Sequence, residues 1–405
     1  MHLSGAFNLK LMDGDGTYPS CSRNGEGEDR WEEERRGEGE EEEKNKKEAT
    51  SFPDWSCEKA QKRAGAVREE WRISETGPLE RRVRDLLGSN SLLAATRMDA
   101  VDALRAFFVF ASCTILSVTL SQSLRSRFVP YGARATSTTE SNSNPSPSES
   151  SWGSPVTRPL DYLAALKVPH GYFTQFYIAS VLSSIFWAVQ LLSRGAAFEA
   201  VATRIRPERL QDVMTLNQIL LCWALVLVQG IRRLVECLAL SKPSSSQMWF
   251  GHWLIGIAFY VAVSVAIWIE GAGTLLAHEY TLDHIKITNV PSLRTFLCLP
   301  LFLFASGLQH DCHFYLFSLK KYTVPAHPLF NRIVCPHYTA ECAIYLSLAL
   351  LAAPPGEWVN KTILSALVFV AINLGVTAGT SRKWYAQKFG EESVRGKWNM
   401  IPVVY

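Results

Sequence analysis

The chain has 405 residues, of which 47% are hydrophobic and 20% are charged, and its formal net charge is only +3. By these averages it resembles an ordinary soluble protein of two or three domains. The averages hide two unlike parts, because residues 1–97 are strongly polar while nearly everything after Met98 is apolar and aromatic-rich. The nine cysteines include no CxxC pair, which argues against a disulfide framework and a zinc ribbon.

Residues 1–97 form the first predicted segment. They include a mixed acidic and basic run from Glu26 to Lys47 and little that builds a core, which predicts a disordered polar extension. The start of the chain lacks the basic-then-apolar pattern of a secretory signal. Met98 lies directly before the first apolar run, so it is a candidate biological start that would leave residues 1–97 out of the mature protein.

Seven apolar segments follow the polar extension. A helix needs about 20 mostly apolar residues to cross a hydrocarbon core of about 30 Å. The candidates, of which the last three are short, are Ala103–Leu120, Tyr172–Leu192, Val213–Ile231, Trp249–Ile269, Leu293–Gly307, Glu341–Ala353 and Ile363–Val376. We predict an all-α, multi-pass membrane bundle of about seven spans with cytosolic cofactor-binding loops.

The connections between these segments differ in composition. Residues 122–167 are rich in Ser, Thr and Pro and predict a flexible loop, while Phe198–Arg209 fits a polar helix. The connection from Gln309 to Tyr338 is long and holds histidines, lysines and aromatic residues. A polar loop between membrane helices must face water or line a cavity, because lipid cannot satisfy its backbone.

Basic residues in the short loops predict the orientation. Most of them fall on the side that also holds the basic tail, while the acidic stretch around Glu270 falls on the other side. With an odd number of spans, the C-terminus is cytosolic. Three arginines on the acidic side are exceptions: Arg204, Arg206 and Arg209. Asn360 begins a lumenal glycosylation sequon, but it lies so close to a span that we do not expect modification.

Polar residues inside apolar segments need partners. Four amides are expected to form hydrogen bonds between helices: Gln175, Gln190, Asn217 and Gln218. Arg232 and Glu236 are four residues apart and suit a local ion pair. Arg233 is then left for a phosphate or lipid headgroups, or the whole cluster simply reaches to the membrane interface.

The segment Gln309–His313 contains residue types that bind metals. Only His310 and His313 share a helical face, and no distant CxxC or HxxxH completes a ligand set, so we predict no metal site. An anionic, aromatic cofactor suits the region better. Lys320 and Lys321 would hold its phosphates, and three aromatic residues would offer stacking surfaces: Tyr322, Phe330 and Tyr338.

The tail Ser381–Tyr385 is a second basic and aromatic group on the same predicted face of the membrane. Such a group often only anchors a last helix among the headgroups. The presence of two groups on one face favours a shared binding site instead.

Taken in order, these motifs resemble the steroid 5α-reductase family, and within it the polyprenol (polyprenal) reductase branch. The matches are Gln309-His310-Asp311-Cys312-His313, Leu319-Lys320-Lys321, Tyr322-Thr323-Val324-Pro325, Cys335-Pro336-His337-Tyr338 with Glu341, Lys383-Trp384-Tyr385 with Lys388-Phe389, and Ile401-Pro402. Two earlier segments also match: Val168-Pro169 with Tyr172-Phe173 and Phe176-Tyr177-Ile178, and Arg232-Arg233-Leu234-Val235-Glu236-Cys237. The resemblance covers the chain from about Met98 to its end.

The resemblance implies an organisation and an activity. Residues 98–306 would form membrane helices with the substrate-binding region, and residues 307–405 would bind NADPH from the cytosol. The enzyme would lie in the endoplasmic reticulum membrane and reduce the α-isoprene double bond of polyprenal in dolichol synthesis for N-glycosylation. Its partners would be a long-chain isoprenoid and membrane lipid, with no nucleic acid and no obligate protein partner.

Family position also implies roles for single residues. The cofactor-binding set comprises Gln309, His313, Lys320, Glu341, Arg233, Arg382 and Lys383. The catalytic candidates are Tyr385, Tyr322 and His337. The substrate-binding candidates are Gln175, Tyr177 and Glu236.

Three positions depart from the family pattern. Arg382 stands where the branch usually has histidine, and a guanidinium cannot donate a proton at neutral pH. His337 stands where the family often has asparagine. Phe176 follows Gln175 where steroid enzymes carry glutamate, so a carboxylate that polarises the steroid is missing. This last departure favours a long isoprenoid substrate.

Other functions stay open at this point. A steroid or enoyl-CoA reductase of the same family, a membrane methyltransferase that uses S-adenosylmethionine, and a non-catalytic lipid-binding protein are the alternatives. No internal repeat supports a transporter. Among isoprenoids we favour the aldehyde, because an isolated allylic alcohol lacks the electron sink that hydride addition requires.

Overall fold

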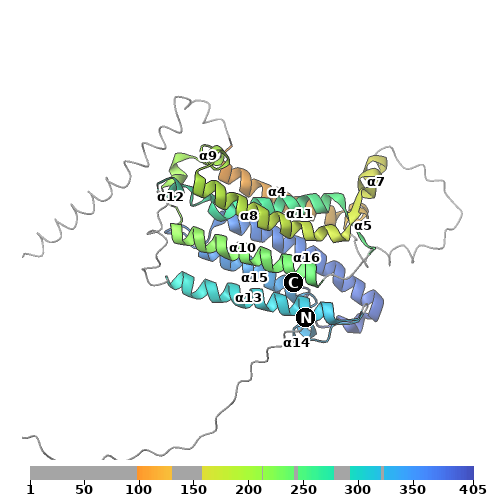
Figure 1. Ribbon diagram of the computed structural model, residues 1–405. Coiled ribbons are helices and arrows are strands. Elements are labelled where there is room, and N and C mark those ends of the chain that lie inside the picture. Colours follow the sequence, from red (N-terminus) through yellow and green to blue (C-terminus); the bar gives the residue numbers. More distant parts are fainter. Residues whose placement is uncertain (1–97, 130–156, 212, 241–244, 278–291, 321–322) are drawn as a thin grey trace, which may run out of the picture. The chain divides into compact units, whose positions relative to one another are not determined.

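The computed structural model describes residues 98–129, 157–211, 213–240, 245–277, 292–320 and 323–405. All of these residues belong to one compact unit, residues 73–405, in which long helices run side by side (Figure 1). The predictions made for residues 1–97, Lys321 and Tyr322 lie outside the described residues.

In the described residues, seven long helices form this unit. They are α4 (Ala100–Leu120), α8 (Thr174–Ser193), α10 (Leu216–Ala239), α11 (Phe250–Ile269), α13 (Leu293–Ser318), α15 (Pro336–Leu351) and α16 (Lys361–Phe389). Each overlaps one predicted span, and α10, α13 and α16 continue well beyond the predicted ends. In the described part of the chain, five are long and apolar enough to cross a membrane, namely α4, α8, α10, α11 and α16. The helical architecture is therefore confirmed, with five candidate membrane spans in the described residues, while a count of seven spans stays a prediction.

The shorter elements correct two predictions. The ends of the connection 122–167 are helical, as α5 (Gln122–Phe128) and α7 (Thr157–Ala165). The stretch predicted as one polar helix is two elements, α9 (Ala196–Ala202) and the 3₁₀ turn η3 (Pro207–Leu210). Pro207 lacks a backbone N–H and therefore begins an element rather than continuing one. The remaining elements are the short helices α12 (Ala272–Ala277) and α14 (Pro328–Arg332) and the turn η5 (Glu391–Ser393).

Two short strands fix where α8 and α11 begin. β1 (Lys167–Pro169) and β2 (Gln247–Trp249) pair antiparallel, with Val168 opposite Met248. β1 leads through the 3₁₀ turn η2 (His170–Phe173) into α8, and β2 leads directly into α11. The two strands come from segments far apart in the sequence. We use the name hairpin end for the end of the bundle at which this antiparallel pair lies. The helices α5 and α7 lie at one end and α9 and α12 at the other (Figure 1).

The prediction of a polar loop from Gln309 to Tyr338 is wrong over the first third of that segment. Helix α13 continues to Ser318, so Gln309–His313 is helical. Its polar side chains find partners on α10 and α15, which removes the need for water or an irregular backbone. The tail from Ser381 to Phe389 is likewise the end of α16.

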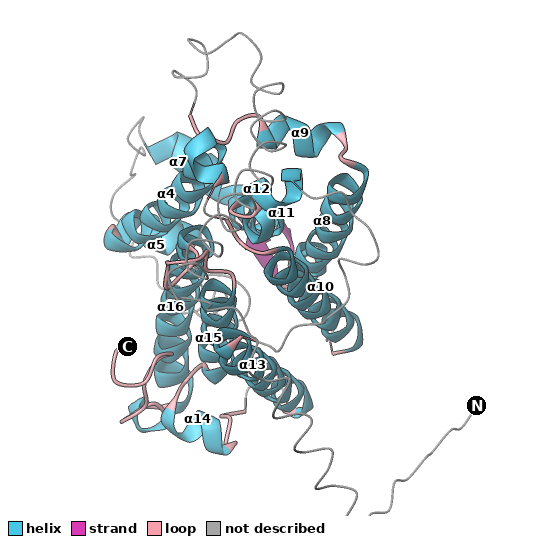
Figure 2. Ribbon diagram, turned by 90° about the vertical axis from the view of Figure 1, so that its left-hand side faces the viewer, coloured by secondary structure: helices cyan, strands magenta, loops and turns pink. Residues whose placement is uncertain are grey.

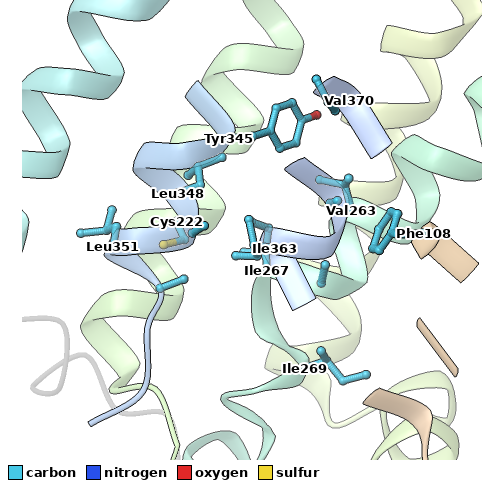
Figure 3. Packing of buried hydrophobic residues seen from close by; sticks show 14 of the residues in the cluster. Phe108, Cys222, Val263, Ile267, Ile269, Tyr345, Leu348, Leu351, Ile363 and Val370 are labelled. Carbon is cyan, nitrogen blue, oxygen red and sulfur yellow. The ribbon is translucent and has the colours of Figure 1, made fainter. Parts of the chain in front are cut away.

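Close packing joins the helices. Helix α8 packs on α10 and α11, α15 packs on α13 and α16, and α4 packs on α16 and α11 (Figure 2). Phe108, Cys222 and Ile363 come from three different helices and are almost completely buried together (Figure 3). Because lipid is as apolar as these side chains, van der Waals packing is what favours association of the helices.

Three helices are also joined by polar contacts at the end opposite the hairpin. Arg105 of α4 donates to Glu270 (Nη2–Oε1, 2.9 Å) and to the hydroxyl of Thr362 (Nε–Oγ1, 2.9 Å). The backbone N–H of Thr362 donates to the same Glu270 oxygen at 2.9 Å. Glu270 follows α11 and Thr362 lies in the first turn of α16, so one carboxylate connects α4, α11 and α16.

Two of the three arginines on the predicted acidic side form ion pairs with nearby carboxylates. The side chains of Arg206 and Arg209 donate to Asp102 at 2.8 Å and 2.7 Å, and the backbone N–H of Arg206 donates to Asp99 at 2.7 Å. Their charges are thus compensated by carboxylates at the start of α4, which explains their place on the otherwise acidic side.

Asn360 is completely buried. Its Oδ1 accepts from the N–H groups of Thr362 (3.1 Å) and Ile363 (2.9 Å), which caps α16. Its Nδ2 donates to the carbonyl of Ala352 at 3.2 Å. The atom that would carry a glycan is therefore buried between helices, in agreement with the expectation that the sequon is not modified.

Replacing Glu270 should destabilise the bundle. Glu270→Ala removes the acceptor shared by Arg105 and Thr362, and hydrogen bonds to charged groups contribute about 1.5–3 kcal/mol each. The measurement is thermal unfolding of the purified protein in detergent. Glu357→Ala is the control, because it removes only the exposed Lys361 pair (2.7 Å), a kind that contributes at most about 1 kcal/mol. Equal unfolding temperatures for the two variants would contradict the structural role of Glu270.

Candidate active site

A cavity of about 340 Å³ lies between the helices at the hairpin end. Among the described residues, six of the seven long helices contribute to its lining, and α4 contributes none. Most of the lining side chains fall into two groups, and α16 adds both apolar and polar residues. Those of η2, α8 and α11 are mainly aromatic or aliphatic, and those of α10, α13 and α15 are mainly polar.

The first group forms an aromatic wall. Phe173 and Phe176 meet edge to face with ring centroids 5.1 Å apart, and Phe176 stacks on Tyr260 of α11 at 6.4 Å. Gly256 permits this arrangement, because a Cβ there would lie only 2.7 Å from Cε1 and Cζ of Phe176. The packing of the aromatic wall therefore depends on a glycine, which has no side chain, at this position of α11.

The second group forms a polar wall. Gln309 and His313 face the cavity from successive turns of α13, and His337 and Glu341 face it from successive turns of α15. The Gln309 amide nitrogen donates to Oε2 of Glu341, and its oxygen accepts from Gln229 of α10 at 2.9 Å. Gln309 is only 3% exposed, so its amide is held in one orientation by these partners.

A buried carboxylate lies behind the polar wall. Glu236 accepts from both Arg232 and Arg233 of its own helix. Its two oxygens also lie 2.7 Å from Nδ1 of His310 and 2.9 Å from Nδ1 of His313 on α13. The predicted Arg232–Glu236 ion pair is thereby confirmed.

Arg233 has partners inside the bundle, which corrects the prediction that it is available for a phosphate or lipid headgroups. It pairs with Glu236, and it donates to the hydroxyl oxygen of Tyr177 from Nε (3.2 Å) and Nη2 (2.9 Å). A buried guanidinium without such partners would carry a large desolvation cost. Both arginines form ion pairs with Glu236.

The predicted amide contacts between helices are present for three side chains. Gln175 accepts from Trp253 at 2.9 Å, Gln190 accepts from the N–H of Ala197 at 3.1 Å, and Gln218 donates to the carbonyl of Leu351 at 3.0 Å. Gln175 therefore links α8 to α11 and lies outside the cavity lining.

The structure brings six predicted site residues to the cavity: Arg233, Tyr177, Gln309, His313, His337 and Glu341. Glu236 supports them from behind. Other predicted residues are not part of its lining. Arg382 donates to the carbonyl of Lys397 at 2.5 Å, and Tyr385 packs against Trp384 and Phe389. Lys320 and Lys383 are exposed at the ends of α13 and α16.

Several lining residues were missed by sequence reasoning. Asn373 and Thr377 lie one turn apart on α16 and both line the cavity, as does His252 of α11. Each is a polar residue within or beside an apolar segment, which was the available signal.

The chain's last segment fixes the start of α15. Ile333 and Trp398 form a β-bridge, and the N–H of Cys335 donates to the carbonyl of Asn399 at 3.1 Å. The hydroxyl of Thr339 donates to the carbonyl of Met400 at 2.5 Å. These contacts hold the first turn of α15, and with it His337 and Glu341.

Comparison with known proteins assigns this region to a family. Residues 249–405 match the family model described as 3-oxo-5-alpha-steroid 4-dehydrogenase. The match relates this part of the chain to the steroid 5α-reductase family. The expectation from its motifs is confirmed.

Three curated relatives extend the comparison toward the N-terminus. Polyprenal reductase 1 of Oryza sativa subsp. indica is 27% identical over 309 residues, which cover 64% of this chain and 84% of the relative. The polyprenal reductase of Saccharomyces cerevisiae is 31% identical over 176 residues, covering 43% and 60%. That of Homo sapiens is 26% identical over 254 residues, covering 56% and 74%.

The aromatic wall can be tested with two glycines. Gly256→Ala forces the Phe176 ring to move, and overpacking of this kind costs about 1–3 kcal/mol. Gly307→Ala on α13 meets no atom within 4 Å and should be neutral or stabilise by up to about 1 kcal/mol through helix propensity. Thermal unfolding of both variants checks this. If Gly256→Ala is as stable as Gly307→Ala, Phe176 is not fixed against α11.

Proposed function

We propose that the protein reduces the α-isoprene double bond of polyprenal with NADPH, a step of dolichol synthesis for protein N-glycosylation. The observation that carries this proposal is one cavity with an aromatic wall on α8 and α11 and a polar wall on α13 and α15. The family of residues 249–405 and the relatives named polyprenal reductase support the same activity.

The residues of the polar wall fit the nicotinamide end of NADPH. A carboxamide has both a donor and an acceptor, and Gln309 and Glu341 together present both kinds of group. The cavity volume of about 340 Å³ suits a nicotinamide ring and the reacting end of a lipid, not a whole dinucleotide. When bound, NADPH supplies the hydride.

The rest of the dinucleotide is assigned to the surface next to the cavity. Lys320 follows the end of α13, and Arg382 and Lys383 lie in the last turns of α16, at the hairpin end. Their positive charges suit phosphate groups. Tyr385, which the family resemblance implies near the cofactor, is proposed for the same region, while His337 lines the cavity itself.

The aromatic wall suits the isoprenoid. Phe173, Phe176 and Tyr260 offer apolar faces to the reacting isoprene unit and exclude water from it. The aldehyde is the proposed substrate, because its carbonyl accepts the electrons that hydride addition releases. Phe176 provides no carboxylate for a steroid carbonyl.

The proposed location is the endoplasmic reticulum membrane, with the hairpin end and the C-terminus in the cytosol. Lys320, Arg332, Arg382 and Lys383 follow or end helices at the hairpin end, and basic residues mark the cytosolic face. NADPH then reaches the cavity from the cytosol, while the long isoprenoid tail stays among membrane lipids.

A substrate panel tests the function. Membranes that contain the protein should consume NADPH with polyprenal and return a product with two additional hydrogen atoms, measured by mass spectrometry. Polyprenol, a 3-oxo-Δ4-steroid and an enoyl-CoA are supplied separately, and S-adenosylmethionine replaces NADPH in a further sample. Reduction of the steroid or the thioester in place of polyprenal would reassign the substrate. If no compound reacts, the protein is better described as a lipid-binding protein.

Glu341 should matter for NADPH. Glu341→Gln removes the charge from the hydrogen bond with Gln309, so the KM for NADPH should rise about ten- to a hundredfold, equivalent to about 1.5–3 kcal/mol. Glu357→Gln is the matched control, since its carboxylate contacts only the exposed Lys361. An increase confined to the KM for the lipid would place Glu341 on the substrate side of the cavity.

A further inference from the structure

We infer that Tyr177 is the acid that protonates the carbonyl oxygen of the substrate, with Arg233 as its positioning residue. This inference rests on the proposed function, because the proton is needed only when an unsaturated carbonyl compound is reduced.

The first observation is the environment of the Tyr177 hydroxyl. Tyr177 is only 6% exposed, yet it lines the cavity at the boundary between the aromatic wall and Arg233. Its oxygen accepts two hydrogen bonds from the Arg233 guanidinium, at 3.2 Å from Nε and 2.9 Å from Nη2. A phenol oxygen has two lone pairs and one hydrogen, so both lone pairs are occupied. The hydroxyl hydrogen is then directed to the oxygen of Tyr260, with which Tyr177 shares a hydrogen bond on the cavity wall, and the carbonyl oxygen of the substrate would replace Tyr260 as its acceptor.

The second observation is the fixed positive charge next to this oxygen. A guanidinium does not lose its proton in proteins, so Arg233 remains a donor throughout the reaction. Its charge stabilises the phenolate that forms when Tyr177 gives up its proton. Glu236 holds Arg233 in place through a second contact, so the donor groups need no rearrangement as charge develops.

The tail residues Tyr385 and Arg382 and the neighbouring Tyr260 are placed less favourably than Tyr177. Tyr385 does not line the cavity, and Arg382 cannot donate a proton at neutral pH. Tyr260 lines the cavity with its ring 5.4 Å from that of Tyr177. In the described part of the chain, however, the hydrogen bonds of Arg233 to tyrosine all go to Tyr177.

The step balances as follows. Hydride from NADPH adds to the β-carbon of the enal, and the electrons of the carbon–carbon π bond move to give negative charge on the carbonyl oxygen. The O–H bond of Tyr177 breaks as a bond from this hydrogen to the carbonyl oxygen forms, which leaves an enol and a phenolate. The enol then takes a proton from water at the α-carbon and releases its hydroxyl proton to give the saturated aldehyde.

The test compares tyrosine-to-phenylalanine variants in membranes with NADPH and polyprenal. Tyr177→Phe should lower kcat about 10²- to 10⁴-fold, the usual contribution of a general acid, while the KM for NADPH changes little. Tyr162→Phe is the control, because this side chain is 70% exposed on α7. NADPH binding and thermal unfolding of each variant show that the loss is not a folding defect.

Other results would overturn the assignment. If Tyr177→Phe keeps wild-type kcat, or if the loss appears in Tyr260→Phe or Tyr385→Phe instead, another group is the acid. Should Tyr177→Phe not fold, Arg233→Lys keeps the charge but loses the paired donors, and kcat must then fall with NADPH binding retained. Wild-type kcat in that variant excludes the proposed pair. If wild-type protein reduces no substrate, the proposed function itself has failed.

Discussion

The carboxylate of Glu236 is the group on which the polar side of the site depends. A buried charge inside a membrane bundle is tolerated only when opposite charges and donors surround it. Glu236 collects two arginines from α10 and two histidines from α13. Each arginine also contacts a residue of the cavity lining: Arg232 contacts Gln309, and Arg233 contacts Tyr177. The positions of three helices around the cavity therefore follow from one acidic side chain.

Backbone pairing supplies the other constraint. The pair β1–β2 sets the starts of α8 and α11, which carry the aromatic wall, and residues 398–400 hold the start of α15, which carries part of the polar wall. Each wall is thus fixed by contacts between segments that are far apart in the sequence. Helix packing alone would leave the rotation of a smooth apolar helix poorly defined, whereas these hydrogen bonds specify it.

Sequence patterns were sufficient for the helices and for much of the site. Long apolar runs located all seven helices, and ordered motifs identified Gln309, His313, His337 and Glu341. The same patterns failed where partners are distant in the sequence. Gln309–His313 looked like a loop because its contacts with α10 and α15 leave no local trace. The position of Tyr385 depends on the rotation of α16, and Asn373 is a single polar residue in an apolar run, so neither was located beforehand.

The boundary of the shared family region, at residue 249, passes through the cavity. The region from α11 onward carries most of the polar wall, but Phe176, Tyr177 and Arg233 come from helices before it. A protein that shared only residues 249–405 would therefore lack part of this pocket. The stretch that matches the family model and the stretch that forms the pocket therefore have different boundaries along the chain.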